Sequence, residues 1–147
     1  MIQIDVDIDV QDRIGAKAKR GVEKFLLDGA QAGQNMAMEH VPEDRSNLRM
    51  SMAQFVPEVR GNEVVWGSTA PHTLPIEKGT QPFWPPAKPL VEWANRIGMD
   101  DSFGYYVQWK IAQEGIESQP FLEPGAEAQA AWYSRKNVND YIDNELK

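Results

Sequence analysis

The sequence predicts an α+β fold, because its apolar residues follow two different periods in separate stretches of the chain. Residues 2–10 place Ile and Val at alternate positions, which is typical of a strand with one buried face. From Asp12 onward the apolar and small residues recur at steps of three and four, which places them on one side of a helix. The 147 residues fit one domain, and we assign residues 1–147 to it.

The long helix is expected to begin near Asp12, which can cap its first turn, and to end before Pro42, which cannot continue it. Four glycines lie inside this stretch, and each costs ~1 kcal/mol of helix stability relative to alanine. We therefore expect this helix to pack closely against a neighbour.

Two β-prone runs, residues 48–59 and 63–69, follow the helix. The turn chemistry of Arg60-Gly61-Asn62 between them predicts a hairpin, and Pro57 fits best at an edge or a bulge. A further short strand is expected at residues 72–77. Closely spaced prolines then predict an ordered, irregular loop.

Three helices are expected in the last part of the chain. Pro89 suits the first turn of a helix that stops at Gly98. Asp100 or Asp101 then caps a second helix that runs to Gly115, and the two form a helical hairpin. Residues 116–122 have an extended pattern. Pro124 then opens a last helix with one face formed by Ala126, Ala130, Tyr133, Asn137 and Tyr141.

Composition excludes several classes of site. The chain has no cysteine and two histidines, so disulfides, thiolate sites and imidazole-rich metal sites are excluded, and we predict no metal and no cofactor. The net charge of -7 argues against wrapping nucleic acid. There is no apolar run of the ~20 residues that a membrane span requires, and no basic, apolar secretory leader at the start. We therefore expect no membrane contact and assembly in a host cytoplasm.

The acidic residues near the start of the chain superficially resemble a calcium loop. Asp5, Asp7, Asp9 and Asp12 stand at loop-like spacings, but counting from Asp5 the positions that need glycine and a closing acid hold Val10 and Ala16. A solvated strand face is the better interpretation. The pair of aspartates at 100 and 101 is explained by helix capping rather than by acid–base catalysis.

Ser68, His72 and Glu77 could supply the nucleophile, base and orienting acid of a small hydrolase. However, the sequence lacks a Gly-x-Ser-x-Gly nucleophile elbow, and it also lacks the glycine loops that bind phosphates. We therefore interpret His72 as a surface or interface residue.

The aromatic residues gather beyond the predicted hairpin. Tyr105 and Tyr106 are adjacent, and Phe83 and Trp84 lie in the proline-rich loop, so these side chains cannot all point inward. Exposed aromatics in ordered segments are typical anchors of protein interfaces. A surface for single-stranded nucleic acid is the rival interpretation, and the scarcity of Lys and Arg disfavours it.

Three motifs in a fixed order make the chain resemble the neck or tail-completion proteins of long-tailed double-stranded DNA phages and archaeal viruses. They are Val41 to Ser51, with the family's proline, acid and Leu-Arg-x-Ser pattern; Ile76 to Thr80, with its Glu-x-Gly-Thr signature; and Gln119 to Gly125, similar to its Pro-Phe-Leu-x-Pro-Ala segment. The resemblance covers roughly residues 12 to 140. The chain departs from the family in having Arg45-Ser46-Asn47 where Thr-Gly is common, and Gly125 for the usual alanine.

The resemblance implies a non-enzymatic subunit with a small antiparallel β-sheet packed against the long N-terminal helix. Such subunits form a ring, here expected to be a hexamer, at the head–tail junction of the virion. The ring would connect the head-completion (connector) protein to the tail terminator and tube, and would line the passage for double-stranded DNA without binding it specifically. The alternatives are a tail-terminator or head-stopper ring, an assembly factor absent from the mature virion, and, more remotely, the small hydrolase.

The resemblance also implies roles for the second motif. Glu77 would fix the backbone where a strand enters the loop, Gly79 would provide dihedral freedom, and residues 81–86 would reach a neighbouring subunit. The residues expected at subunit interfaces are Glu77, Gly79, Thr80, Phe83, Trp84, Tyr105, Tyr106, Pro120 and Phe121.

Overall fold

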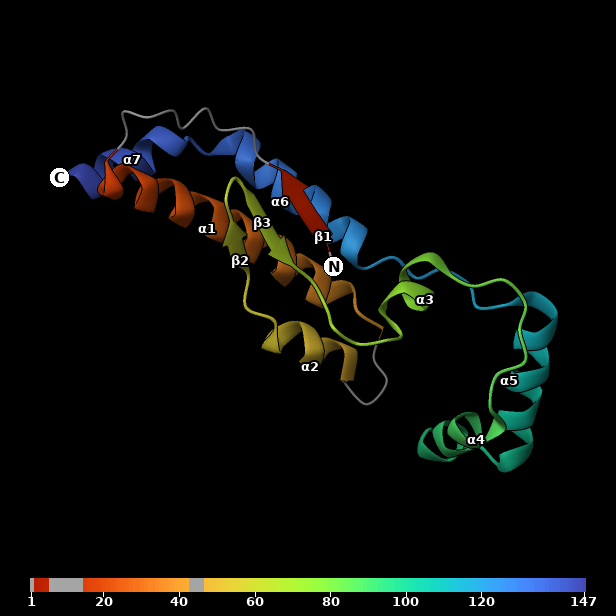
Figure 1. Cartoon of the computed structure of the whole chain (residues 1–147). Coiled ribbons are helices and arrows are strands. Elements are labelled where there is room, and N and C mark those ends of the chain that lie inside the picture. The colour runs from red at the N-terminus through yellow and green to blue at the C-terminus, as the bar shows by residue number, and fades with distance from the viewer. Residues whose placement is uncertain (1, 6–14, 43–46) are drawn as a thin grey trace. The chain divides into compact units, whose positions relative to one another are not determined.

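The computed structural model of the chain describes residues 2–5, 15–42 and 47–147 (Figure 1). In chain order the elements are β1 (Ile2–Asp5), α1 (Ala16–His40), α2 (Asn47–Gln54), β2 (Glu58–Arg60), β3 (Glu63–Trp66), α3 (Thr73–Lys78), α4 (Ala87–Arg96), α5 (Asp101–Glu114), α6 (Leu122–Arg135) and α7 (Val138–Leu146). Helices and one small antiparallel sheet confirm the predicted α+β fold. None of the described helices is both long and apolar enough to cross a membrane.

The chain divides into two compact units. We call them the sheet unit, Met1–Thr73 with Pro120–Lys147, and the hairpin unit, Leu74–Gln119. The sheet unit holds the sheet together with α1, α2, α6 and α7, and the hairpin unit holds α4 and α5. The assignment of the whole chain to a single domain stays a prediction.

The sheet is antiparallel with the strand order β1-β3-β2. Its central strand β3 is well buried, with Val64, Val65 and Trp66 each at most 2% exposed. The predicted hairpin is confirmed, because β2 pairs with β3 and Gly61 takes φ 64° in the turn between them. The predicted N-terminal strand is confirmed over Ile2–Asp5, and the rest of it, with Asp12 as the proposed helix cap, lies outside the described residues.

The prediction of a strand through residues 48–59 is wrong in its first half, which forms α2. A strand would place Leu48, Met50 and Met52 on one face. The helix instead buries Leu48 and Met52 and leaves Met50 53% exposed. The buried side chain of Gln34 on α1 donates to the carbonyl oxygens of Met52 and Phe55 at the end of α2. This contact satisfies acceptors that the end of a helix leaves open.

The predicted short strand at residues 72–77 is also wrong, because this segment forms the helix α3. Pro75 falls in the first turn, where a missing N–H removes no helical hydrogen bond. The hydroxyl of Thr73 donates to the carbonyl oxygen of Ala70, 2.7 Å away, and holds the turn that precedes the helix.

The predicted single C-terminal helix is two helices, α6 and α7. The chain leaves the helical conformation at Lys136, and the Asn137 side chain caps α7 by accepting from the N–H of Asn139 at 3.0 Å. Both helices lie along α1 (Figure 1). Tyr133 of α6 and Tyr141 of α7 place their ring centres 5.1 and 5.6 Å from that of Phe25 on α1.

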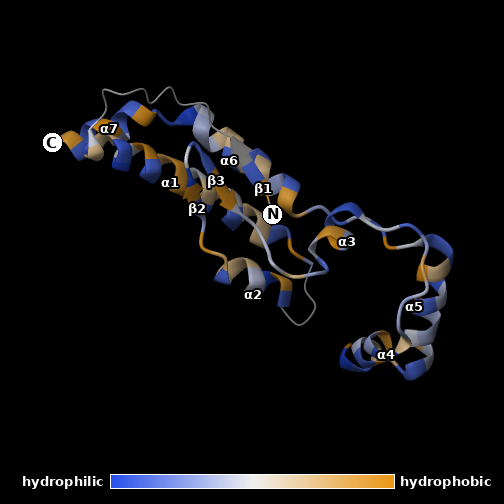
Figure 2. Ribbon diagram, viewed as in Figure 1, coloured by the Kyte–Doolittle hydropathy of each residue, from blue (hydrophilic) through white to orange (hydrophobic). Residues whose placement is uncertain are grey.

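The close packing expected of the long helix is confirmed where α1 meets α6. A Cβ atom on Gly33 would lie 2.8 Å from the carbonyl oxygen of Gly125, and one on Gly125 would lie 2.6 Å from that of Gly33. Hydrophobic residues recur along α1 (Figure 2), and ten of its residues are buried. The glycines that weaken an isolated helix therefore allow two backbones to touch.

A chain of buried polar groups connects the sheet to α6 and α1. The indole N–H of Trp66 donates to Oε1 of Gln129 at 2.6 Å, and Nε2 of Gln129 donates to the Tyr133 hydroxyl at 3.2 Å. That hydroxyl donates to the carbonyl oxygen of Leu26 at 2.7 Å. Trp66 and Gln129 are both fully buried, so these bonds satisfy groups that water cannot reach.

The predicted helical hairpin is confirmed in α4 and α5. Gly98 takes φ 82° after α4, and the Asp100 side chain caps α5 by accepting from the N–H of Phe103 at 3.2 Å. The helices approach closely at Gly104, where a Cβ atom would lie 2.6 Å from the Cα atom of Val91.

We expect Gly33→Ala to destabilise the protein, because the added methyl group has no space beside the Gly125 backbone. The overpacking should lower the free energy of unfolding by about 1–3 kcal/mol in spite of alanine's better helix propensity. Urea denaturation followed by circular dichroism measures this change. Gly15→Ala is the control, because nothing lies within 4 Å of a Cβ atom there. Equal stability of the two variants would contradict the close helix contact.

Candidate functional site

A two-point clamp in the hairpin unit closes the base of the segment that carries α4 and α5. The Thr80 N–H donates to the carbonyl oxygen of Ile116 at 2.9 Å, and the Ile116 N–H donates to the Thr80 hydroxyl at 3.0 Å. The N–H of Gln119 also donates to the carbonyl oxygen of Ile76 at 2.7 Å. The second and third sequence motifs therefore meet through the backbone hydrogen bond between Gln119 and Ile76.

Glycine is required on both sides of this clamp. Gly79 takes φ 71°, and a Cβ atom there would lie 2.6 Å from the carbonyl oxygen of Ile116. Gly115 takes φ 78° and faces the Thr80 carbonyl oxygen without space for a side chain. The dihedral freedom expected of Gly79 is confirmed. Glu77 lies half-buried in the last turn of α3, so it leads into the loop from a helix and not from the expected strand.

The hairpin unit has a minimal core. Of residues 74–119, all of which the structure describes, only Pro85, Ala94 and Gly104 are buried. Eight of the eleven large hydrophobic residues that are exposed in the described part of the chain lie in this unit. Such a distribution is the reverse of what a self-sufficient domain shows, because large apolar side chains are exposed and few are buried.

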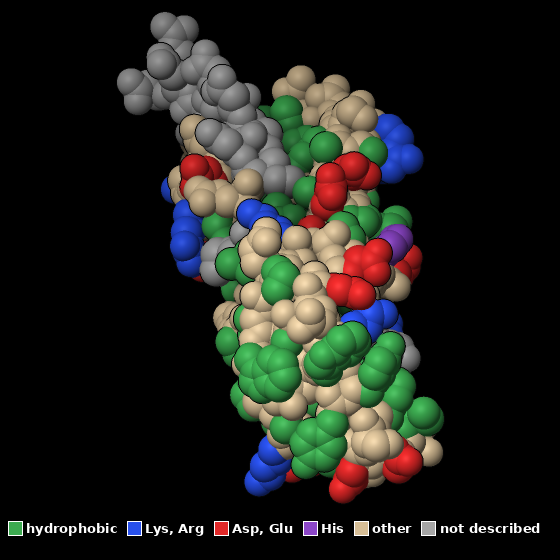
Figure 3. Space-filling view, turned by 90° about the vertical axis from the view of Figure 1, so that its right-hand side faces the viewer, with side chains coloured by type: hydrophobic (Ala, Val, Ile, Leu, Met, Phe, Trp, Pro, Cys, Tyr) green, Lys and Arg blue, Asp and Glu red, His purple; other side chains and the backbone are tan. Residues whose placement is uncertain are grey.

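Five aromatic side chains form what we call the aromatic face of the hairpin unit. They are Phe83, Trp84, Tyr105, Tyr106 and Trp109, and their exposed fractions lie between 43 and 66%. Figure 3 shows hydrophobic side chains gathered over α4 and α5, with charged side chains mainly around them. At roughly half exposure, five such side chains present on the order of 500 Å² of largely apolar surface.

The outward side of α5 is unusual because it carries an uncharged stripe. Gly104 turns toward α4, and the opposite side of the helix carries the uncharged stripe Ser102, Tyr105, Tyr106, Trp109 and Gln113, with the exposed charge of Lys110 beside it. A surface helix normally places charged residues there. Tyr106 stacks on Trp109 with ring centres 6.2 Å apart and an angle of 29° between their planes, so this stripe is ordered.

The loop before α4 is held against α5. Nε2 of Gln108 donates to the carbonyl oxygen of the buried Pro85 at 2.7 Å. This bond fixes the segment that carries Phe83 and Trp84 beside the helix that carries the two tyrosines. The expectation that these four aromatics cannot all point inward is confirmed, since all four are exposed, whereas their role at a subunit interface stays a prediction.

The two interface residues expected from the third motif have different surroundings. Pro120 is exposed, but Phe121 is fully buried in the sheet unit. Including Phe121 in the interface set was wrong, because its ring belongs to the core and is not available to a partner. The sequence pattern could not separate the two, since both precede a helix in an extended segment.

The residues suggested for a hydrolase do not form a catalytic arrangement. The Ser68 hydroxyl is buried, accepts from the Ala70 N–H at 3.1 Å and lies 3.0 Å from the Thr73 hydroxyl oxygen, so it holds a turn. His72 is exposed, and no hydrogen bond joins it to Ser68 in the described part of the chain.

Metal binding finds no support in residues 2–5, 15–42 and 47–147, which contain no group of three or more candidate ligand side chains. The calcium-like series falls largely outside this part of the chain. Asp5 belongs to β1, and the other three aspartates of the series lie among residues that are not described.

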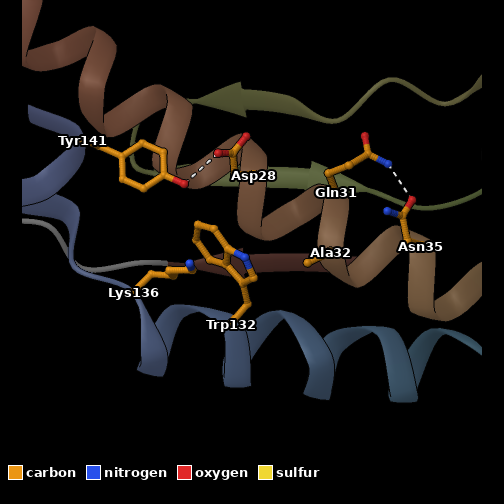
Figure 4. Close-up of a pocket in the computed structure, with 7 residues that line it drawn as sticks. All are labelled: Asp28, Gln31, Ala32, Asn35, Trp132, Lys136 and Tyr141. Atoms are coloured by element: carbon orange, nitrogen blue, oxygen red, sulfur yellow. Dashed lines mark hydrogen bonds between the residues drawn. The ribbon is translucent and has the colours of Figure 1, made fainter. Parts of the chain in front are cut away.

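A shallow hollow of about 360 Å³ lies where α1 faces α6 and α7 (Figure 4). Its lining residues are Asp28, Gln31, Ala32, Asn35, Trp132, Lys136 and Tyr141. The Tyr141 hydroxyl donates to the Asp28 carboxylate at 2.7 Å, and the Gln31 amide donates to Asn35 at 2.8 Å. Burial, and then the Asp28 carboxylate, raise the pKa of Tyr141 to about 12. The hydroxyl therefore stays protonated and serves to join α7 to α1.

The known proteins that the chain resembles match it over a short segment. No protein-family model and no solved structure matches the chain. Pullulanase A of Streptococcus pneumoniae serotype 2 (strain D39 / NCTC 7466) and of serotype 4 (strain ATCC BAA-334 / TIGR4) are each 36% identical to it over 62 residues. The match covers 42% of the chain but only 5% and 4% of these two relatives. The chain thus spans a small fraction of the curated proteins it matches.

We expect Thr80→Ala to loosen the clamp, because it removes the hydroxyl that accepts from the Ile116 N–H. The loss should be about 1 kcal/mol and should raise the amide exchange rate of Ile116 about fivefold. Hydrogen exchange followed by NMR measures this rate. Thr80→Ser keeps the hydroxyl and should exchange as the wild type does. Unchanged protection of Ile116 in the alanine variant would show that the side chain plays no part.

We expect Asp28→Asn to lower the pKa of Tyr141 from about 12 while leaving it above 10, because burial continues to favour the neutral phenol. Ultraviolet absorbance titration measures the change, and Tyr141→Phe identifies the signal against that of Tyr133, whose pKa burial also raises. A raised pKa in the folded state contributes stability below pH ~10 that disappears as the pH rises to ~12. Wild-type stability should therefore fall in this window more steeply than that of Tyr141→Phe.

Proposed function

We propose that this chain is a non-enzymatic structural subunit of a ring at the head–tail junction of a long-tailed double-stranded DNA virus. Copies of the chain, six by the family resemblance, surround the DNA passage and connect the head-completion complex to the tail terminator and tube. The observation that carries this proposal is the aromatic face, because a subunit whose work is assembly needs adhesive surface and not a catalytic pocket.

The size of the aromatic face supports a contact with another protein. A standard interface covers about 800 Å² on each partner, of which the central part is apolar and the rim polar. The ~500 Å² of aromatic surface suits such a centre, and Ser102 and Gln113 at its margin suit the rim. Tyr and Trp are also the residues that most often dominate binding energy at interfaces.

The three motifs of the resemblance have clear structural roles in the chain. The Gly79–Thr80 pair closes the clamp against Ile116, and Gly125 in the third motif makes the contact with α1. Leu48, which follows the proline and acid of the first motif, is buried in the sheet unit. The second motif therefore holds the unit that presents the aromatic face, and this supports carrying the family's role over to this chain, whereas Gly125 is a position at which the chain departs from the family.

The charge of the chain is compatible with a DNA passage that does not bind its contents. The net charge of -7 repels the phosphate backbone, so DNA can slide past an acidic wall. The proposed partners are accordingly other copies of this chain and the proteins before and after it along the axis.

The proposal predicts that a virus lacking this protein makes filled heads and complete tails that stay unjoined, because the connecting ring is absent. Electron microscopy counts joined particles, and added wild-type protein should restore them. When the added protein is limiting, the Trp109→Ala variant should restore at least ~10-fold fewer joined particles than the wild type, as expected for a residue that anchors an interface. Leu146→Ala is the control, since Leu146 is 55% exposed on α7.

Mass spectrometry of purified particles completes this test. A protein that is required for joining but absent from particles would be an assembly factor, and one found at another level of the tail would be a terminator or head-stopper subunit. Normal joining without the protein would overturn the proposal.

A further inference from the structure

The sheet unit has a second, smaller apolar surface, in the segment from α2 to β2. Within residues 47–60, Met50 and Val56 are 53 and 78% exposed. The same segment contains Arg49, Arg60 and one acid, Glu58, which pairs with Arg60 at 2.9 Å, so its net charge is +1 in a chain whose total is -7. We call this segment, Asn47 to Arg60, the α2–β2 shoulder.

The α2–β2 shoulder is opposite in net charge to α5 and exposes apolar side chains that can contact aromatic rings. The thioether of Met50 and the branched side chain of Val56 are suited to contact aromatic rings, because methionine adapts to irregular surfaces and its sulfur favours aromatic neighbours. The segment of residues 100–114, which carries α5, has three acids and one base, a net charge of -2. Opposite charges at the margins favour and orient such a contact.

Ring symmetry requires two different surfaces on one subunit. In a closed ring each contact is heterologous, so one patch of a copy meets another patch of the next copy. The aromatic face and the α2–β2 shoulder lie in different compact units and together hold most of the exposed large hydrophobic residues of the described chain. A two-fold contact of the aromatic face with itself would not suit an axis whose two ends bind different partners.

We propose that the aromatic face of one copy docks on the α2–β2 shoulder of the next copy in the ring. The inference rests on the proposed function, since it assumes a ring, and it adds the identity of the two contacting surfaces. Trp109 and Val56 belong to opposite sides of this contact, and each is more than half exposed in the single chain.

Cysteine cross-linking in assembled particles tests the contact, because the natural chain contains no cysteine. Particles are built with protein in excess, because Trp109 variants are expected to join poorly at limiting protein, and they carry Trp109→Cys, Val56→Cys, an equal mixture of the two, or the double variant. They are then treated with a short bis-maleimide and examined by denaturing electrophoresis and peptide mass spectrometry. We expect dimers in the mixture at least ten times more abundant than with either single variant, and a ladder of higher multimers with the double variant.

Three other outcomes would overturn the inference. Dimers formed by Trp109→Cys alone would show that the aromatic face meets itself, and a cross-link within one chain of the double variant would show that the chain's own sheet unit covers the face. Particles that contain the protein at the junction but give no chain-to-chain cross-link would assign the face to a different protein. This last result leaves the proposed function intact, whereas absence of the protein from the junction would overturn the proposed function itself.

Discussion

The contact between the backbones of Gly33 and Gly125 determines the geometry of the sheet unit. It brings α1 and α6 so close that a methyl group on either residue would overlap a carbonyl oxygen of the other helix. Trp66 lies directly against this contact, and its ring is the largest buried side chain of the unit. A buried indole needs an acceptor for its N–H, and Gln129 is near enough to provide one because α6 approaches so closely. The polar chain through Tyr133 therefore depends on the glycine contact.

The sequence predicts the features that local chemistry decides. The turn at Gly61, the stop at Gly98 and the cap at Asp100 each depend on residues next to one another in the chain, and all three are found. The hairpin of α4 and α5 follows from these signals together with the spacing of apolar residues. The spacing of apolar residues at steps of three and four likewise predicts a helix over nearly the whole of α1.

The features that were mispredicted depend on contacts between distant parts of the chain. The segment that forms α2 has a β-prone sequence pattern. Its helical conformation is favoured by Gln34 of α1, whose side-chain amide donates to carbonyl oxygens at the end of α2. No local rule places that amide there. Similarly, Phe121 and Phe83 both stand beside prolines, yet one fills the core and the other is 43% exposed. The sequence indicates that the aromatic side chains cannot all be buried, but only the fold determines which of them face outward.

The clamp between Thr80 and Ile116 has a consequence for how such a protein diversifies. Two hydrogen bonds bring the ends of residues 81–115 together, so this lobe enters and leaves the rest of the chain at nearly the same point. Insertions at a closed base disturb little of what lies outside it. Changes in the length or sequence of residues 81–115 can therefore alter the binding partners of such a protein while the fold of the sheet unit is preserved.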